Sequence, residues 1–250
     1  MMKRVFTVVM IALLSCTVSC AQGSGSQRQS PSSSSSPSPS HRHGGGGKVK
    51  HPKVDDGTYK PKVLRFVVEG VPFEMVEVRG GTFTMGASSA SESWGDDRPT
   101  HKVTVDDYYI AKTIVTQGLW QAIMGTTLTD FASQLGVCTY GVGDDYPMYF
   151  ISWDDCEEFI GKLNEITQMN FHLPTEAEWE FACRGGKNSK KYKYSGSNDI
   201  DEVAWYSDNS NASTQPVATK APNELGIYDM SGNVWEWCSD WFGFYTRDSQ

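Results

Sequence analysis

The chain has 250 residues, of which 38% are hydrophobic and 21% are charged, so it is long enough to bury a sizeable core. Its charge is uneven: residues 63–250 contain 13 Lys and Arg against 28 Asp and Glu. A region this acidic repels phosphate backbones, which argues against nucleic-acid binding, whereas it suits a hard cation such as calcium.

Residues 1–21 are predicted to be a secretory signal. Lys3 and Arg4 precede an apolar run of ten residues, Val5–Leu14, which is too short for a membrane-spanning helix. Two endings fit the sequence. Ser19-Cys20-Ala21 allows ordinary cleavage before Gln22, while the sequences ending at Cys16 and at Cys20 each resemble a lipoprotein signal with a cysteine to be lipidated. We therefore expect an exported chain in the periplasm or cell envelope, with a possible lipid anchor.

Residues 22–62 are predicted to be a disordered linker. Residues 22–47 consist largely of Ser, Pro and Gly and contain no apolar periodicity, so they cannot offset the entropy lost on ordering. A flexible stalk behind a membrane anchor is the natural interpretation.

The folded domain is expected to start at Val63. Two β-favouring runs, 63–69 and 71–78, flank a short Glu-Gly turn and predict a hairpin. Residues 82–85 alternate between polar and apolar side chains, which predicts a further strand. Residues 102–110 predict one more strand.

Three helices are predicted from their start signals. The first begins at Thr116 and ends at Gly125. The second begins at Ser152 and the third at Thr175, and each carries an acidic residue three positions later, as in a capping box.

The remainder of the chain is predicted to be mostly loop, although it is rich in tryptophan. We expect its indoles to lock an irregular fold by packing in the core; they are Trp205, Trp235, Trp237 and Trp241.

Four cysteines lie beyond the signal: Cys138, Cys156, Cys183 and Cys238. In an exported domain they can pair in three ways, between which the sequence does not choose, or stay unpaired. None has the Cys-x-x-Cys spacing of zinc or redox sites. We expect burial to raise the pKa of the thiols of the last three, so we assign no catalytic residue.

Six motifs, taken in chain order, point to a known protein family. They are GGTFTMG (80–86), DRPTHKV (97–103), VTQGLWQAIMG (115–125), ISWDDCEEF (151–159), HLPTEAEWEFACRGG (172–186) and PNELGIYDMSGNVWEWCSDW (222–241). Together they resemble the formylglycine-generating-enzyme family, also called the sulfatase-modifying-factor domain, over nearly all of the globular part.

The resemblance implies a single irregular α+β domain over residues 63–250, similar to the C-type lectin fold and poor in regular secondary structure. In the family's enzymes a copper-binding cysteine pair oxidises a cysteine of a client sulfatase to formylglycine. Related domains bind ligands or act as lipoproteins of bacterial surface machinery, so the family determines the fold better than the chemistry.

The resemblance also implies a calcium site. Its ligands map here onto Asp229, the carbonyls of Gly232 and Val234, and Glu236. Two carboxylates and two carbonyls within eight residues supply hard oxygen ligands, and water can complete the shell. The alternative is that both acids cap backbone amides.

The family's catalytic cysteine pair lies downstream of the GN-x-WEW motif and is not found before Gln250. We therefore expect a domain that is incomplete at its C-terminus, with copper relevant only if such a pair exists. We therefore expect a domain of the oxidase family that is not catalytically competent in the sequence given. The rivals are a lectin-like surface domain that binds protein or glycan and an accessory lipoprotein of an envelope complex.

Overall fold

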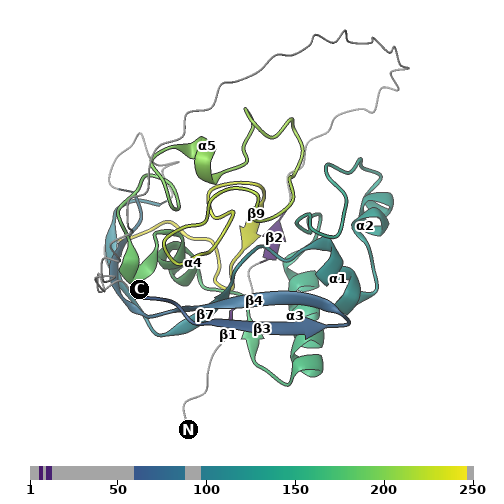
Figure 1. Ribbon diagram of the computed structural model, residues 1–250, viewed down its shortest axis with the longest axis horizontal. Coiled ribbons are helices and arrows are strands. Elements are labelled where there is room, and N and C mark those ends of the chain that lie inside the picture. The colour runs from purple at the N-terminus through teal and green to yellow at the C-terminus, as the bar shows by residue number, and fades with distance from the viewer. Residues whose placement is uncertain (1–5, 8–9, 13–58, 88–96, 247–250) are drawn as a thin grey trace, which may run out of the picture. The chain divides into compact units, whose positions relative to one another are not determined.

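The computed structural model describes residues 6–7, 10–12, 59–87 and 97–246 (Figure 1). Most of the predicted signal, the linker up to residue 58, and both candidate lipidation sites, Cys16 and Cys20, lie outside the described residues. Among those described, no helix combines the length and the apolar character needed to cross a membrane.

The predicted hairpin is confirmed. Strands β3 (Val63–Val68) and β4 (Val71–Val78) pair antiparallel from Val68↔Val71 to Val63↔Val76. Both turn residues, Glu69 and Gly70, have positive φ values of 48° and 83°, as the tightest hairpin turns require.

The single strand predicted over residues 102–110 is wrong, because the chain breaks it in two. Strand β6 (His101–Val105) pairs with β5 (Gly81–Met85), whereas β7 (Tyr108–Ala111) pairs with β4 in the larger sheet. The break is fixed by Asp107, whose Oδ1 accepts a hydrogen bond of 2.8 Å from the Gly80 N–H. Residues 101–105 and 108–111 therefore belong to two different sheets.

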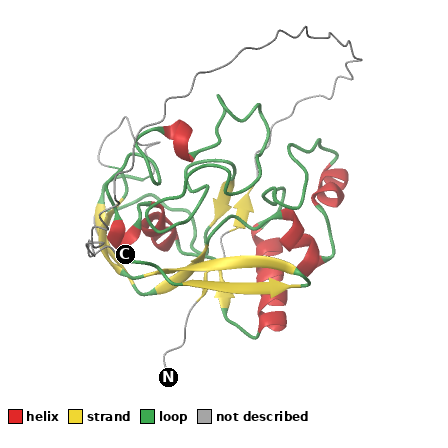
Figure 2. Ribbon diagram, in the orientation of Figure 1, coloured by secondary structure: helices red, strands yellow, loops and turns green. Residues whose placement is uncertain are grey.

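The larger sheet has the strand order β3-β4-β7-β1-β8. Figure 2 shows the strands in yellow and the helices in red. Strand β1 (Phe6–Thr7) runs parallel to both of its neighbours, β7 and β8 (Phe171–His172). A separate pair joins β2 (Met10–Ala12) antiparallel to β9 (Trp235–Trp237).

The three predicted helices are confirmed with their caps. Helix α1 (Gln117–Met124) ends at Gly125, which adopts φ 72°. Helices α3 (Trp153–Thr167) and α4 (Glu176–Cys183) begin with complete capping boxes, in which the side chains at N-cap and N3 each bond the other's backbone N–H.

Three short helices were not predicted: α2 (Leu128–Leu135), the 3-10 helix η1 (Gly186–Asn188) and α5 (Ile200–Val203). Helix α2 carries a capping box formed by Thr127 and Asp130. Its apolar residues Leu128, Phe131, Ala132 and Leu135 have helical spacing, so the sequence carried a signal for α2 that the prediction missed.

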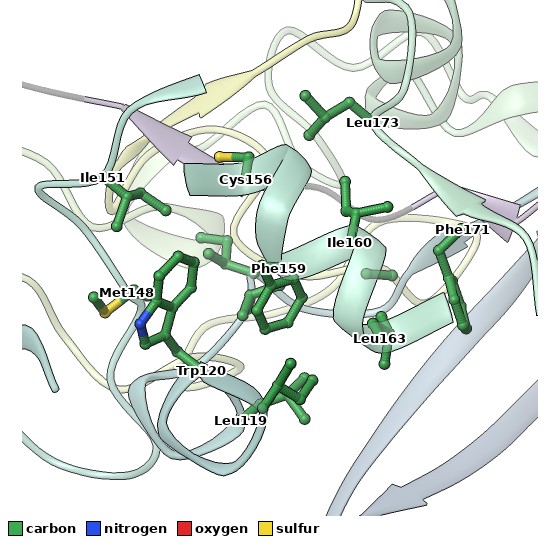
Figure 3. Close-up of a cluster of buried hydrophobic side chains, with 14 of the residues drawn as sticks. Leu119, Trp120, Met148, Ile151, Cys156, Phe159, Ile160, Leu163, Phe171 and Leu173 are labelled. Carbon is green, nitrogen blue, oxygen red and sulfur yellow. The ribbon is translucent and has the colours of Figure 1, made fainter. Parts of the chain in front are cut away.

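Two hydrophobic clusters share the sheet. On β4 and β7 the residues alternate between them: Met75, Tyr109 and Ala111 contribute to the first cluster, and Val76, Tyr108 and Ile110 to the second. At the centre of the first cluster the Trp120 indole stacks on the Phe159 ring at 5.3 Å between centroids (Figure 3). Helices α1 and α3 are thereby joined.

The C-terminal part is loop-rich, as expected, and the described residues form an α+β domain. The expected burial of all four tryptophans is wrong. Trp205 and Trp237 are partly buried, but 62% of Trp235 and 99% of Trp241 are exposed.

Candidate functional site: the Asp229–Cys238 loop

The predicted calcium ligands lie on one tight loop that leads into β9. Asp229 and Asn233 have positive φ values of 61° and 72°. Gly232 separates them, and a Cβ at this position would lie 2.3 Å from the Trp205 carbonyl oxygen. The Asn233 N–H donates to the same oxygen at 2.8 Å. Glycine at residue 232 is therefore required by the close approach of two backbone segments.

Asp229 is a buried carboxylate with one free oxygen. Only 3% of the residue is exposed. Its Oδ2 accepts a hydrogen bond of 2.8 Å from the Ala218 N–H, while its Oδ1 is buried with no hydrogen-bond partner. Burial raises the pKa of this carboxyl, and the Ala218 bond offsets the rise only in part. A buried acceptor without a partner is costly, so the oxygen suits a cation or a bound water.

Glu236 is the second carboxylate of the loop. Its pKa is raised to about 8, mainly by desolvation, and the charge of Asp229 contributes to the rise. The Trp179 indole N–H lowers this pKa, although it makes no hydrogen bond of normal geometry. The structure thus brings Asp229 and Glu236 close enough for their charges to interact. Among the described residues, no cationic side chain is paired with either carboxylate.

The two predicted carbonyl ligands belong to the same turn. The Gly232 carbonyl accepts the Val234 N–H at 3.0 Å, and the Val234 side chain packs against the first cluster. In the part of the chain that the structure describes, no three His, Cys, Asp or Glu side chains are grouped to hold a metal. A cation here would therefore depend on two carboxylates, backbone carbonyls and water, a donor set that suits calcium.

The free thiols are protonated and desolvated, as expected. Cys156, Cys183 and Cys238 are free, so none of the three full pairings is formed, and Cys138 is disulfide-bonded. Burial raises the pKa of the Cys183 thiol to about 12, and it raises those of Cys156 and Cys238 further. The Cys183 Sγ donates to the Met230 carbonyl at 3.3 Å. Thiols in this state are poor nucleophiles and poor copper ligands.

Sequence reasoning missed Asn223, a buried side chain that joins the segment before the loop to α4 and to Ser195. Its Nδ2 donates to the Ala182 carbonyl at 2.9 Å and to Ser195 Oγ at 3.1 Å. Its Oδ1 accepts the N–H groups of Leu225 and Ile227 at 3.0 and 3.2 Å. The local signal is an Asx-type turn in Pro-Asn-Glu-Leu-Gly, but the distant partners leave no trace in the sequence.

Comparisons with known proteins identify the family of this chain. Residues 68–249 match the model of the sulfatase-modifying factor enzyme 1-like domain. The chain is 32% identical to the Chaperone protein LppX of Paenibacillus barcinonensis, over 67% of this chain and 71% of that protein. It is 33% identical to the formylglycine-generating enzyme of Streptomyces coelicolor, over 39% of this chain and 33% of the enzyme.

Other matches are partial or structural. The chain spans only 29% of the serine/threonine-protein kinase pkn1 of Chlamydia pneumoniae, at 29% identity. Among solved structures, Treponema denticola variable protein 1 is similar with a TM-score of 0.64 and 27% identity, over 76% of this chain and 81% of that one. Together, the loop, the fold and the matched residues show that the chain belongs to the sulfatase-modifying factor enzyme 1-like, or formylglycine-generating-enzyme, domain family.

Proposed function

We propose that this chain is an exported, calcium-stabilised member of the family that binds a protein partner in the cell envelope and does not itself oxidise cysteine. The observation that carries the proposal is the state of the free thiols, which burial holds protonated. The name of the relative LppX, a chaperone, supports a role exercised on another protein.

Copper chemistry does not fit the thiols described here. A cysteine pair that binds copper must present thiolates to the metal, and the pKa of each free thiol is raised rather than lowered. These three thiols therefore do not fit an oxidative step.

Calcium, by contrast, fits the Asp229–Cys238 loop. Asp229 Oδ1 is an acceptor without a partner, and Glu236 supplies a second carboxylate on the same loop. When bound, the ion would neutralise both charges and hold the loop, a structural contribution.

Calcium should stabilise the wild-type protein by about 2–3 kcal/mol at a hundredfold excess over Kd. Asp229→Asn and Glu236→Gln should each remove most of this gain, as measured by thermal unfolding and by direct calcium titration. Glu165→Gln, on the exposed face of α3, is the matched control and should retain it. If a chelator does not change the unfolding of the wild type, and if both loop variants unfold as the wild type does, there is no calcium site.

The purified protein, supplied with copper and oxygen, should leave a client sulfatase cysteine unmodified. Mass spectrometry of the sulfatase peptide measures the outcome, with a formylglycine-generating enzyme as positive control. Formylglycine that forms with the wild type and disappears in Cys183→Ala or Cys238→Ala would overturn the proposal and make this chain an oxidase.

Export and lipid anchoring follow from the predicted signal. The chain should sediment with membranes, and either Cys16→Ala or Cys20→Ala should release it. Cell fractionation with antibody detection measures this. Wild-type chain found only in the soluble fraction would exclude the anchor while leaving the binding role intact.

A further inference from the structure

Basic side chains gather in one loop of an otherwise acidic domain. Residues 187–193, Lys-Asn-Ser-Lys-Lys-Tyr-Lys, contain four of the 13 Lys and Arg of residues 63–250 and none of their 28 acids. All four lysines are exposed: Lys187, Lys190, Lys191 and Lys193. Four cations this close together create a locally positive potential, although the domain as a whole is negative.

Hydrogen bonds fix the backbone of this loop. Glu224 Oε1 accepts the Lys190 N–H at 2.8 Å, and Asn198 Oδ1 accepts the Lys193 N–H at 3.0 Å. Between these two residues, Lys191 adopts a φ of 59°. The loop therefore presents its lysines from an ordered backbone, so that binding a partner does not require the loop itself to be ordered first.

The end of the predicted linker lies beside the same loop. Asn188 Nδ2 donates a hydrogen bond of 2.7 Å to the carbonyl of Tyr59, with which the described range 59–87 begins. Lys60 and Lys62 follow and are exposed, and the Arg79 guanidinium lies 4.2 Å from the centre of the Tyr59 ring. We call these seven cations the basic patch: Lys60, Lys62, Arg79, Lys187, Lys190, Lys191 and Lys193.

Acidic residues offset this charge only in part. Glu77 lies 3.8 Å from Lys62 Nζ and accepts a hydrogen bond from the Tyr59 hydroxyl, but 68% of the Lys62 side chain remains exposed. Glu224 binds a main-chain N–H of the loop, as described above. Counting both carboxylates, the basic patch keeps an excess of positive charge.

Two tyrosines lie among the lysines. Lys190 Nζ is 5.8 Å from the centre of the Tyr192 ring, and Lys193 Nζ is 5.0 Å from the centre of the Tyr194 ring. Tyr192 is itself exposed. A tyrosine has an apolar ring and a polar hydroxyl, a combination that suits the headgroup level of a membrane.

We propose that the basic patch docks this domain on a membrane surface by binding the phosphates of anionic phospholipid headgroups. A membrane is favoured over other polyanions because the linker that ends at this patch follows the predicted signal, with its possible lipid anchor. The inference rests on the proposed function, since it takes the chain to be exported to the cell envelope.

Docking through this patch would orient the domain. The membrane surface attracts the basic patch and repels the acidic remainder, so one side of the domain faces the lipid. Screening at physiological salt keeps such binding weak and reversible. A chain without its lipid would therefore still be released from membranes, and the patch would act mainly on a domain that is already tethered.

Vesicle sedimentation tests the inference on the full chain carrying Cys16→Ala and Cys20→Ala, so that no lipid anchor contributes. Vesicles of phosphatidylcholine alone are compared with vesicles that also contain phosphatidylglycerol, in a chelator that prevents calcium from bridging protein and lipid. The variants are Lys191→Gln and the pair Lys190→Gln with Lys191→Gln. The matched control is Lys162→Gln, which removes one lysine from α3.

A second measurement does not depend on the cysteine substitutions. Hydrogen exchange at residues 187–193 is followed in the wild-type chain on both kinds of vesicle, with α2 amides as internal reference. A lipid anchor inserts into either vesicle, so a difference between the two reports on the headgroups. Thermal unfolding checks that every variant is folded.

The proposal predicts binding to the anionic vesicles, about tenfold or weaker binding to the neutral ones, and slower exchange of the loop on the anionic vesicles alone. Each lysine near an anionic surface strengthens binding about fivefold. Lys191→Gln should therefore weaken binding about fivefold and the double variant about 25-fold, while Lys162→Gln binds as its parent does. Raising the salt from about 0.05 to 0.5 M shortens the Debye length roughly threefold and should release the protein.

Equal binding to both kinds of vesicle, or an equal loss in Lys162→Gln, would overturn the proposal. So would binding of inorganic polyphosphate without binding to the vesicles, because the patch would then serve a soluble polyanion. Calcium titration of the same chain tests the proposed function separately. Vesicle binding without a calcium response contradicts only that function, and a calcium response without vesicle binding contradicts only the docking.

Discussion

Glu74 illustrates how a single charged residue links stability to pH. Its Oε2 lies 2.6 Å from Lys112 Nζ and its Oε1 lies 2.6 Å from Arg65 Nε. The hydrogen bond from Lys112 is the main reason that the pKa of this carboxyl is lowered, and the bond from Arg65 adds to it. Because the folded-state pKa lies below the unfolded one, the stabilisation is present above the ordinary Glu pKa and is lost as pH falls through the lowered value.

Glu74→Gln should therefore lower the free energy of unfolding by about 1 kcal/mol near neutral pH. The deficit should shrink towards zero at acidic pH, where wild-type Glu74 is protonated. Urea unfolding at a series of pH values measures it, with Glu165→Gln as the exposed control. A deficit that does not change with pH would mean that packing, not charge, stabilises this position.

At this scale, residue identities were easier to predict than their surroundings. The resemblance pointed to Asp229 and Glu236, but the groups around them come from elsewhere in the chain. Ala218 satisfies one oxygen of Asp229, and Trp179, on α4, approaches Glu236. The unpaired state of Asp229 Oδ1 depends on this packing, which the local sequence does not encode.

Among the elements, α3 shows how a few polar residues define a helix start. Ser152 Oγ accepts the Asp155 N–H at 3.1 Å, and Asp155 Oδ2 accepts the Ser152 N–H at 2.7 Å. Ser152→Ala should lower the free energy of unfolding by about 1 kcal/mol, since it leaves the Asp155 N–H without its partner. Ser152→Thr keeps the hydroxyl and should cost little. Equal losses for the two substitutions in denaturant unfolding would show that the cap is not responsible.

The elements that could be predicted are those with a complete local signal. The hairpin has its turn residues, and α1, α3 and α4 have start signals followed by an apolar face. The break at Asp106–Asp107 could not be predicted, because its cause is a bond to Gly80, which lies 27 residues earlier. Helix α2 is an exception, since its capping box is followed by apolar residues at helical spacing and it could have been predicted from the sequence.

For the whole molecule, the family resemblance gave the fold correctly, while the residues alone gave only its local pieces. Apart from the β3–β4 hairpin, the neighbours in the larger sheet are far apart in sequence, and β8 joins the sheet through two residues. Such pairings depend on the sum of many side-chain contacts rather than on a motif. The exposure of Trp235 and Trp241 was missed for the same reason, because a tryptophan in a loop does not reveal what packs against it.

The alternation of residues along β4 and β7 has a consequence for how the domain comes apart. Each of these strands places side chains in both clusters, so the loss of either cluster also removes one wall of the other. Partial melting would expose apolar surface on the half that remained, and its free energy would approach that of complete unfolding. We therefore expect the two clusters to unfold as one cooperative unit, so that a substitution that destabilises the sheet destabilises the packing on both of its faces.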